Sequence, residues 1–392
     1  GGGHNIAGLA ACDGGLMLDM SAMRGVWVDR ERQVARAQAG CLLGDVDTET
    51  QLHGLATALG FVSATGIAGL TLGGGFGYLT RRFGWTSDNV LGMDLVTAEG
   101  RLERASPSEN PDLFWALCGG GGNFGVLTGF DYRLHRLGPE IIAGAIAWRG
   151  DDIEAVLDHY QRLTAQAPAE LTCVLVLRFA PPAPWLPADV HGKPVAVMMV
   201  CHSGALEEGE RAAAPIKSFR KPAGDVVQRR PYTSLQSMLD ATQPKGRRYY
   251  WKSEYLPSLE PAVLAAALPH FEAMPSPLSA IVFFPLGEAL AKEPPGGSAA
   301  GNRDARWVFN VTASWEKPED DAKNVEWARG AWQDLRRFST GGTYVNFLNA
   351  EEGDDRIRAA YGPNLSRLAA VKGRWDPGNL FRVNKNIPPA AI

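Results

Sequence analysis

The chain has 392 residues, of which 45% are hydrophobic and 21% are charged, and its net charge at pH 7 is −4. This composition is that of a soluble globular protein with two or three domain-sized units. The lack of a long basic cluster argues against a nucleic-acid-binding protein. No apolar run approaches the roughly 20 residues that a membrane helix needs.

The cysteines are odd in number and widely spaced, with no Cys-x-x-Cys pair, and the seven histidines form no metal-binding cluster. We therefore expect no disulfide framework and no bound metal. Free, buried thiols in a reducing compartment fit this pattern best, which favours a cytoplasmic location. The cysteines are Cys12, Cys41, Cys118, Cys173 and Cys201.

The first 140 residues predict short strands and turns with few helices. The clearest helical pattern is in residues 47–59, where Leu52, Leu55 and Leu59 recur at helical spacing. This spacing predicts a helix with the three leucines on one face.

A hairpin and a short helix are predicted next. Residues 90–97 are rich in β-formers and end at a Glu-Gly turn, so residues 101–105 are expected to be the return arm of the hairpin. Asn110 and Pro111 predict the start of a short helix, with asparagine as the cap and proline in the first turn.

From about residue 141 the pattern changes to strands that alternate with longer helices. Residues 153–164 carry apolar side chains at helical spacing and predict a helix. Proline-rich residues 181–185 and 294–298 predict loops. The predicted strands are residues 172–178, 195–201 and 307–315.

Aromatic residues cluster in the same region. Alternate residues of a strand share a face, so Tyr249, Trp251 and Tyr255 are expected on one surface. Phe283 and Phe284 form a second aromatic pair. Two interpretations stay open: these rings are the core of their domain, or some of them form a platform for a substrate.

Two glycine-rich runs, residues 62–77 and 119–128, indicate where backbone comes close to a ligand. Glycine is poor core material but lets backbone N–H groups approach a phosphate-bearing cofactor. Neither run has the features of a dinucleotide fingerprint or of a P-loop. Flexible surface loops are the alternative, which is weakened by the strand-like sequence that flanks both runs.

Together with residues 1–5, 108–117, 344–346 and 375–387, these runs match one pattern. The chain resembles bacterial members of the berberine-bridge-enzyme-like group, within the vanillyl-alcohol-oxidase superfamily of flavoproteins. The match includes both ends of the chain in the right order, whereas residues 143–340 are much less diagnostic. A strand-helix-strand unit precedes the first motif in that family, so the resemblance implies that this sequence is incomplete at its N-terminus.

The resemblance implies an α+β fold. It consists of a PCMH-type FAD-binding domain and an inserted substrate domain, in which helices cover an antiparallel sheet. The expected division is an FAD-binding domain in residues 1–140, a substrate-binding domain in 141–340, and a C-terminal segment, 341–392, that returns to the FAD domain.

The implied cofactor is FAD, which in this family is bonded through its 8α-methyl group to the histidine matched here by His4. An expression tag is the other explanation for Gly-Gly-Gly-His, but the residues after it continue the family pattern. Many relatives have a second tether from a cysteine, where this chain has Val62, so a single tether is expected. The cofactor-binding residues implied are His4, Thr65, Gly66, Gly69, Gly73, Gly74, Gly75, Phe76, Gly77, Gly122, Asn123, Gly125, Val126, Asn384 and Asn386.

The implied activity is that of an oxidase. It takes a hydride from an alcohol-type or related C–H group of a sugar or secondary metabolite, and oxygen reoxidises the flavin to give H₂O₂. The partners are thus a small molecule and oxygen, with no nucleic acid or membrane. Two alternatives remain: a dehydrogenase with another electron acceptor, and a flavin-binding protein without turnover. Thr65 matches a family position that influences oxygen access, and its small size favours the oxidase.

Tyr344 and Asn346 are the implied catalytic residues. In a strand they would share a face, and the family's tyrosine acts as a base or orients the substrate hydroxyl. Because the ordinary tyrosine pKa is about 10, a base at neutral pH needs a neighbouring cation or a hydrogen bond. Lys385 is the candidate cation. A buried structural tyrosine is the alternative.

Overall fold

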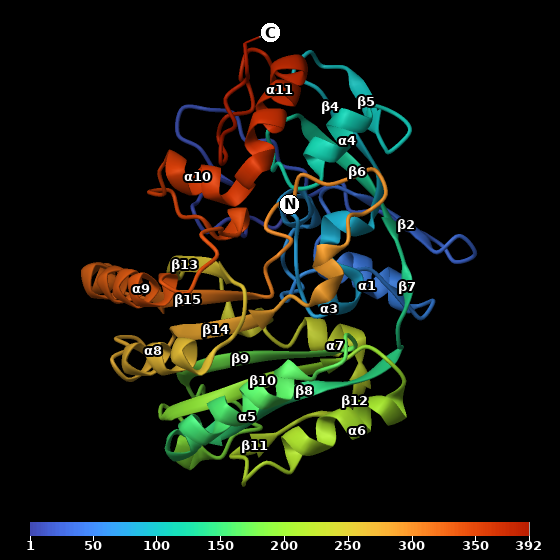
Figure 1. Cartoon of the computed structure of the whole chain (residues 1–392). Helices are drawn as coiled ribbons and strands as arrows, with labels where there is room; N and C mark the ends of the chain where they lie inside the picture. Colours follow the sequence, from blue (N-terminus) through green and yellow to red (C-terminus); the bar gives the residue numbers. More distant parts are fainter. Residues whose placement is uncertain (392) are drawn as a thin grey trace.

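The computed structural model describes residues 1–391 and has two sheet-centred halves (Figure 1). The first half holds a five-stranded antiparallel sheet. Its order is β1 (Val26–Asp29), β2 (Val34–Gln38), β6 (Val126–Arg133), β4 (Val90–Val96) and β5 (Leu102–Ala105). Around it lie α1 (Leu43–Gln51), α2 (Ile67–Leu72), α3 (Thr80–Phe83), α4 (Pro111–Leu117) and the small pair β3 (Leu55–Ala56) and β7 (His135–Arg136).

The second half is built on an eight-stranded antiparallel sheet. The strand order is β11 (Gly224–Asp225), β8 (Glu140–Arg149), β10 (Pro194–His202), β9 (Leu171–Phe179), β14 (Ala280–Pro285), β15 (Trp307–Trp315) and β13 (Arg248–Leu256), with β12 (Gln228–Pro231) also paired to β8.

Four helices cover one face of this sheet (Figure 1). They are α5 (Ile153–Ala165), α6 (Leu206–Lys217), α8 (Pro261–Glu272) and α9 (Asp321–Arg336). Strand alternation decides what lies on each face: Leu175 and Leu177 of β9 are buried in the core beneath the helices, whereas Val174, Val176 and Arg178 line a cavity on the other face. This architecture confirms the predicted α+β fold.

The tail of the chain comes back to the first half. The helices α10 (Asp354–Tyr361) and α11 (Leu365–Trp375) lie at the top of Figure 1, where α11 contacts α4. The buried Lys372 ammonium donates hydrogen bonds to the backbone oxygen of Asn123, 2.7 Å away, and to the carboxylate of Asp376, 2.5 Å away. The second glycine-rich run is thereby tied to the tail.

Most predicted elements have structural counterparts. The hairpin is β4 and β5, and the predicted later strands are β9, β10 and β15. The helix at residues 153–164 is α5, and α4 begins at Pro111. Asn110, however, does not cap α4 with its side chain, because its amide donates instead to the Arg104 backbone oxygen at 2.7 Å.

The prediction of a helix over residues 47–59 was wrong. Helix α1 starts earlier, where the Asp45 carboxylate accepts the Leu42 N–H at 2.7 Å, and it ends at Gln51. The leucines do not share a face: Leu52 is 73% exposed, and Leu55 lies in β3. A turn with Gly54 at a φ of 64° separates the helix from β3.

Candidate functional site

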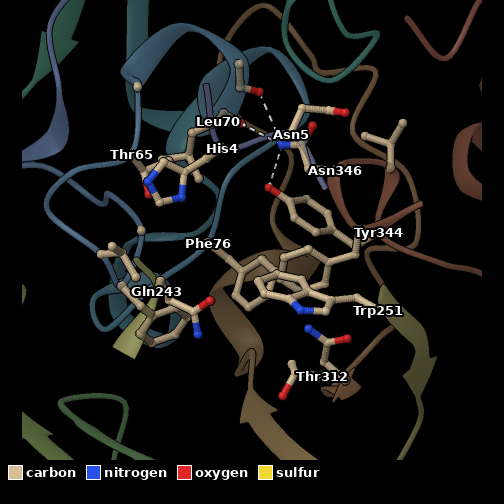
Figure 2. A pocket seen from close by; sticks show the side chains of 18 of the residues that line it. His4, Asn5, Thr65, Leu70, Phe76, Gln243, Trp251, Thr312, Tyr344 and Asn346 are labelled. Atoms are coloured by element: carbon tan, nitrogen blue, oxygen red, sulfur yellow. Dashed lines mark hydrogen bonds between the residues drawn. The ribbon is translucent and has the colours of Figure 1, made fainter. Parts of the chain in front are cut away.

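A cavity of about 450 Å³ lies between the glycine-rich loops of the first half and the face of the eight-stranded sheet that is opposite to the four helices. The N-terminal segment and residues 344–347 and 383–385 complete its wall. Figure 2 shows His4, Thr65, Trp251, Gln243 and Tyr344 around this space.

The structure brings most of the predicted site residues to one cavity. On its wall are His4, Thr65, Gly66, Gly69, Phe76, Gly122, Asn123, Asn384, Tyr344 and Asn346. The others do not line the cavity: Gly73, Gly74, Gly75, Gly77, Gly125, Val126 and Asn386.

The glycines divide into two groups by what a side chain would meet. At Gly3, Gly69 and Gly122, which line the cavity, an added Cβ would meet nothing within 4 Å. At Gly77 an added Cβ would lie 1.9 Å from the Leu59 backbone oxygen. The first group leaves room for a ligand, and the second allows close packing of the protein's own backbone.

Tyr344 and Asn346 come together, but not through a strand as predicted. Residues Val345–Phe347 form a 3₁₀ turn, and the Asn346 amide donates to the Tyr344 hydroxyl oxygen at 2.9 Å (Figure 2). The Gly75 N–H donates to the same oxygen at 3.2 Å. Both acceptor sites of the hydroxyl are thus filled, and its proton is left to donate into the cavity.

The protonation state of Tyr344 follows from its surroundings. Burial raises the pKa of this phenol far above its ordinary value, against the effect of the two hydrogen bonds. The expected cation does not offset this, because the Lys385 ammonium donates to the Asn349 backbone oxygen. Burial also lowers the pKa of Lys385, whose charged neighbours are Glu352 and Lys252.

Comparison with known proteins agrees with this geometry. The family described as FAD binding domain matches residues 1–106, and the family described as berberine and berberine like matches residues 343–388. An FAD-linked oxidoreductase of Dictyostelium discoideum is 30% identical, with 97% of this chain and 81% of that protein covered. The (R)-6-hydroxynicotine oxidase of Paenarthrobacter nicotinovorans is 31% identical, with 99% and 84% covered.

A solved structure supports the same grouping. The 6-hydroxy-D-nicotine oxidase of Arthrobacter nicotinovorans has a TM-score of 0.87 and 28% identity, with 99% of this chain and 86% of that one covered. The chain belongs to the berberine-bridge-enzyme-like family of FAD-linked oxidoreductases. Its cofactor is therefore FAD.

The cavity of this berberine-bridge-enzyme-like protein fits that cofactor. Open glycines give one wall the bare backbone that a flat, phosphate-bearing molecule needs. Among residues 1–391, four buried polar atoms of residues on the wall lack a hydrogen-bond partner: the Tyr78 hydroxyl oxygen, the Trp251 Nε1, the Asn310 Oδ1 and the Asn384 Oδ1. Buried polar atoms without partners are rare in folded proteins, and bound ligands would satisfy them.

The substrate side of the site includes residues that the motifs do not reveal. Arg178, Gln243, Asn310 and Thr312 line the cavity beside Trp251, which the aromatic pattern alone marks as a possible platform residue. Strand alternation offers a signal, because Arg178 follows two valines at a spacing of two in an otherwise apolar strand. Within the part of the chain that the structure describes, no helix is long and apolar enough to cross a membrane.

Proposed function

We propose that this protein is an oxidase that removes a hydride and a proton from an alcohol-type or related C–H group of a small molecule, and that oxygen is the electron acceptor. Bound FAD supplies the hydride acceptor and returns the electrons to oxygen as H₂O₂. One observation carries the proposal: a single cavity has a bare-backbone wall on one side and a side-chain wall on the other. Relatives named (R)-6-hydroxynicotine oxidase and chitooligosaccharide oxidase support it.

The proposal assigns FAD binding to one unit of the chain and substrate binding to another. The FAD-binding unit consists of residues 1–140 and 341–392, and the substrate unit of residues 141–340. In support, the eight-stranded sheet begins with β8 at Glu140, and α9, which packs on its last strands, ends at Arg336.

His4 is proposed to be the single attachment point for the flavin. The imidazole lines the cavity, and partial burial, together with the Lys245 ammonium, lowers its pKa. The neutral ring therefore predominates at neutral pH and keeps one nitrogen lone pair for a bond to carbon. Val62, also on the wall, has no nucleophile to form a second bond.

Tyr344 is proposed to orient the substrate rather than to act as the base. Its hydroxyl stays protonated and can donate to a substrate oxygen, with Asn346 and Gly75 holding its position. Asn346 is itself held by a hydrogen bond to the Gly69 backbone oxygen at 3.2 Å. The pair thus links the reacting group to the glycine-rich run.

The test is anaerobic mixing of the FAD-loaded protein with a panel of alcohols, amines and oligosaccharides. Loss of the oxidised flavin colour identifies a substrate, and admission of air should restore the colour with release of H₂O₂. Reduction followed by slow reoxidation in air would indicate a dehydrogenase. If no member of the panel bleaches the flavin, the proposal fails.

A further inference from the structure

Arg178 is an unusual cation for its position. It lies on β9 with its side chain on the cavity face, in register with Ala280 of β14, which is in turn paired with Thr312 of β15. Val174 and Val176 precede it on the same face, so it lies at the end of an apolar strip. The guanidinium therefore reaches the substrate side of the cavity.

No carboxylate neutralises Arg178 among residues 1–391. Its Nε donates to the Phe179 backbone oxygen at 3.1 Å, and its one close charged neighbour is another cation, Arg247. Burial and Arg247 lower its pKa, as expected for a positive charge without a counterion. By contrast, the buried Arg356 pairs with Glu254 at 2.7 Å.

The same cavity holds another free donor. The Gln243 side-chain amide makes no hydrogen bond to the described residues and lies on the cavity wall (Figure 2). Thr312 adds no further donor, because its hydroxyl proton goes to the Ala280 backbone oxygen at 3.0 Å. A planar guanidinium with both terminal nitrogens free binds a carboxylate through two parallel hydrogen bonds.

We infer that the substrate of this enzyme is an apolar monocarboxylate, whose carboxylate is bound by Arg178 and whose hydrocarbon body lies against Val176, Val282 and Phe284. The inference rests on the proposed oxidase function and names its substrate class. Pairing with the substrate anion would neutralise a cation that the fold leaves without a partner, and a neutral sugar would not.

Binding tests the inference without any turnover. We would titrate the FAD-loaded protein calorimetrically with benzoate, phenylacetate and 4-phenylbutyrate, each beside its uncharged amide. At least one acid should bind about tenfold or more tightly than its amide. Arg178→Gln should weaken the binding of that acid about 10- to 100-fold and leave the amide unchanged.

Two further variants control for the possibility that Arg178→Gln weakens binding only because the protein misfolds. Arg178→Lys keeps the charge without the planar fork and should give an intermediate affinity. Arg149→Gln changes an arginine of β8 that pairs at the surface with Asp189, and it should match the wild type. Unchanged acid binding in a folded Arg178→Gln protein, or acids that bind no better than amides, would overturn the inference.

Turnover separates this inference from the proposed function. Benzyl alcohol and 4-(hydroxymethyl)benzoate would be compared as reductants of the flavin. If neutral alcohols are oxidised and Arg178→Gln has no effect on either compound, the oxidase stands and the carboxylate site is refuted. If acids bind through Arg178 but no compound reduces the flavin, the binding site stands and the oxidase is refuted.

Discussion

The two walls of the cavity differ in what they present to a ligand. On the side of the first half, Gly3, Gly69 and Gly122 present bare backbone. On the side of the sheet, the lining consists of side chains such as those of Val176 and Trp251. A backbone wall suits a cofactor shared by many enzymes, whereas a side-chain wall can change with each substrate without a change of fold.

The largest effect expected on the backbone wall is that of His4→Ala. Wild-type protein precipitated with acid should keep its yellow colour, because a bond to His4 survives denaturation. The variant should release all of its flavin, and His53→Ala, at an exposed histidine outside the cavity, should release none. Free flavin from acid-treated wild type would refute the covalent bond, and a second flavin-linked peptide around Val62 would refute the single tether.

Where the two walls meet, Tyr344→Phe removes one hydroxyl. Flavin reduction should slow by about 10²-fold, which is what a substrate misplaced by about 1 Å costs. Because the pKa of Tyr344 is raised, its protonated form persists across the neutral range and above it, so its contribution should not change there. Rapid-mixing absorbance measures both effects.

Tyr255→Phe is the matched control, since it loses a hydroxyl in the same aromatic cluster without lining the cavity. A rate that rises with pH through this range in the wild type, and not in Tyr344→Phe, would instead make Tyr344 the base.

Two glycine variants separate cofactor binding from folding. Gly77→Ala would force a Cβ to within 1.9 Å of the Leu59 oxygen, so it should destabilise the protein by several kcal/mol, about the largest cost of a single substitution. Gly69→Ala lies in α2 with open space beside it and should stabilise the helix by about 0.5–1 kcal/mol.

The same Gly69 variant should lower the FAD content, because its methyl group enters the cavity. Thermal melting measures the stability of the Gly77→Ala and Gly69→Ala proteins, and the ratio of flavin to protein absorbance measures their FAD content. Full FAD content in Gly69→Ala would show that the cofactor does not approach this part of the wall.

The smallest effect is expected at Thr65. Thr65→Leu narrows the cavity beside the glycine-rich run and should slow reoxidation by air about tenfold, with flavin reduction little changed. Thr65→Val keeps the branched shape without the hydroxyl and should reoxidise at the wild-type rate. Stopped-flow reoxidation at known oxygen concentrations measures these rates. Equal rates in the wild type, Thr65→Leu and Thr65→Val would show that Thr65 does not control the access of oxygen.

The difference between the two walls of the cavity also explains which parts of the site the sequence could predict. The FAD-side site is encoded in contiguous motifs, so the glycine-rich runs stand out by composition, and the family resemblance points to His4 and Thr65. Elements with clear periodicity, such as α5 and β15, were also predicted correctly. The prediction of a helix over residues 47–59 was wrong because leucine spacing alone does not reveal the turn at Gly54.

The substrate side could not be predicted in this way. The cavity position of Arg178 depends on which face of β9 the helices cover, and its neighbours depend on pairing with β14. Such pairings join residues about 100 positions apart, and no local pattern specifies them. Tyr344 and Asn346 show the reverse case: their proximity was predicted, but a 3₁₀ turn produces it instead of a strand.

The alternation along β9, β14 and β15 also makes the enzyme suitable for redesign. Every second side chain of these strands packs under the helices, and most of the side chains between them line the cavity. A combinatorial library confined to the cavity face could therefore change substrate preference while the core beneath the helices and the flavin loops keep their native sequence. Its positions would be Val174, Val176, Arg178, Ala280, Val282, Asn310 and Thr312.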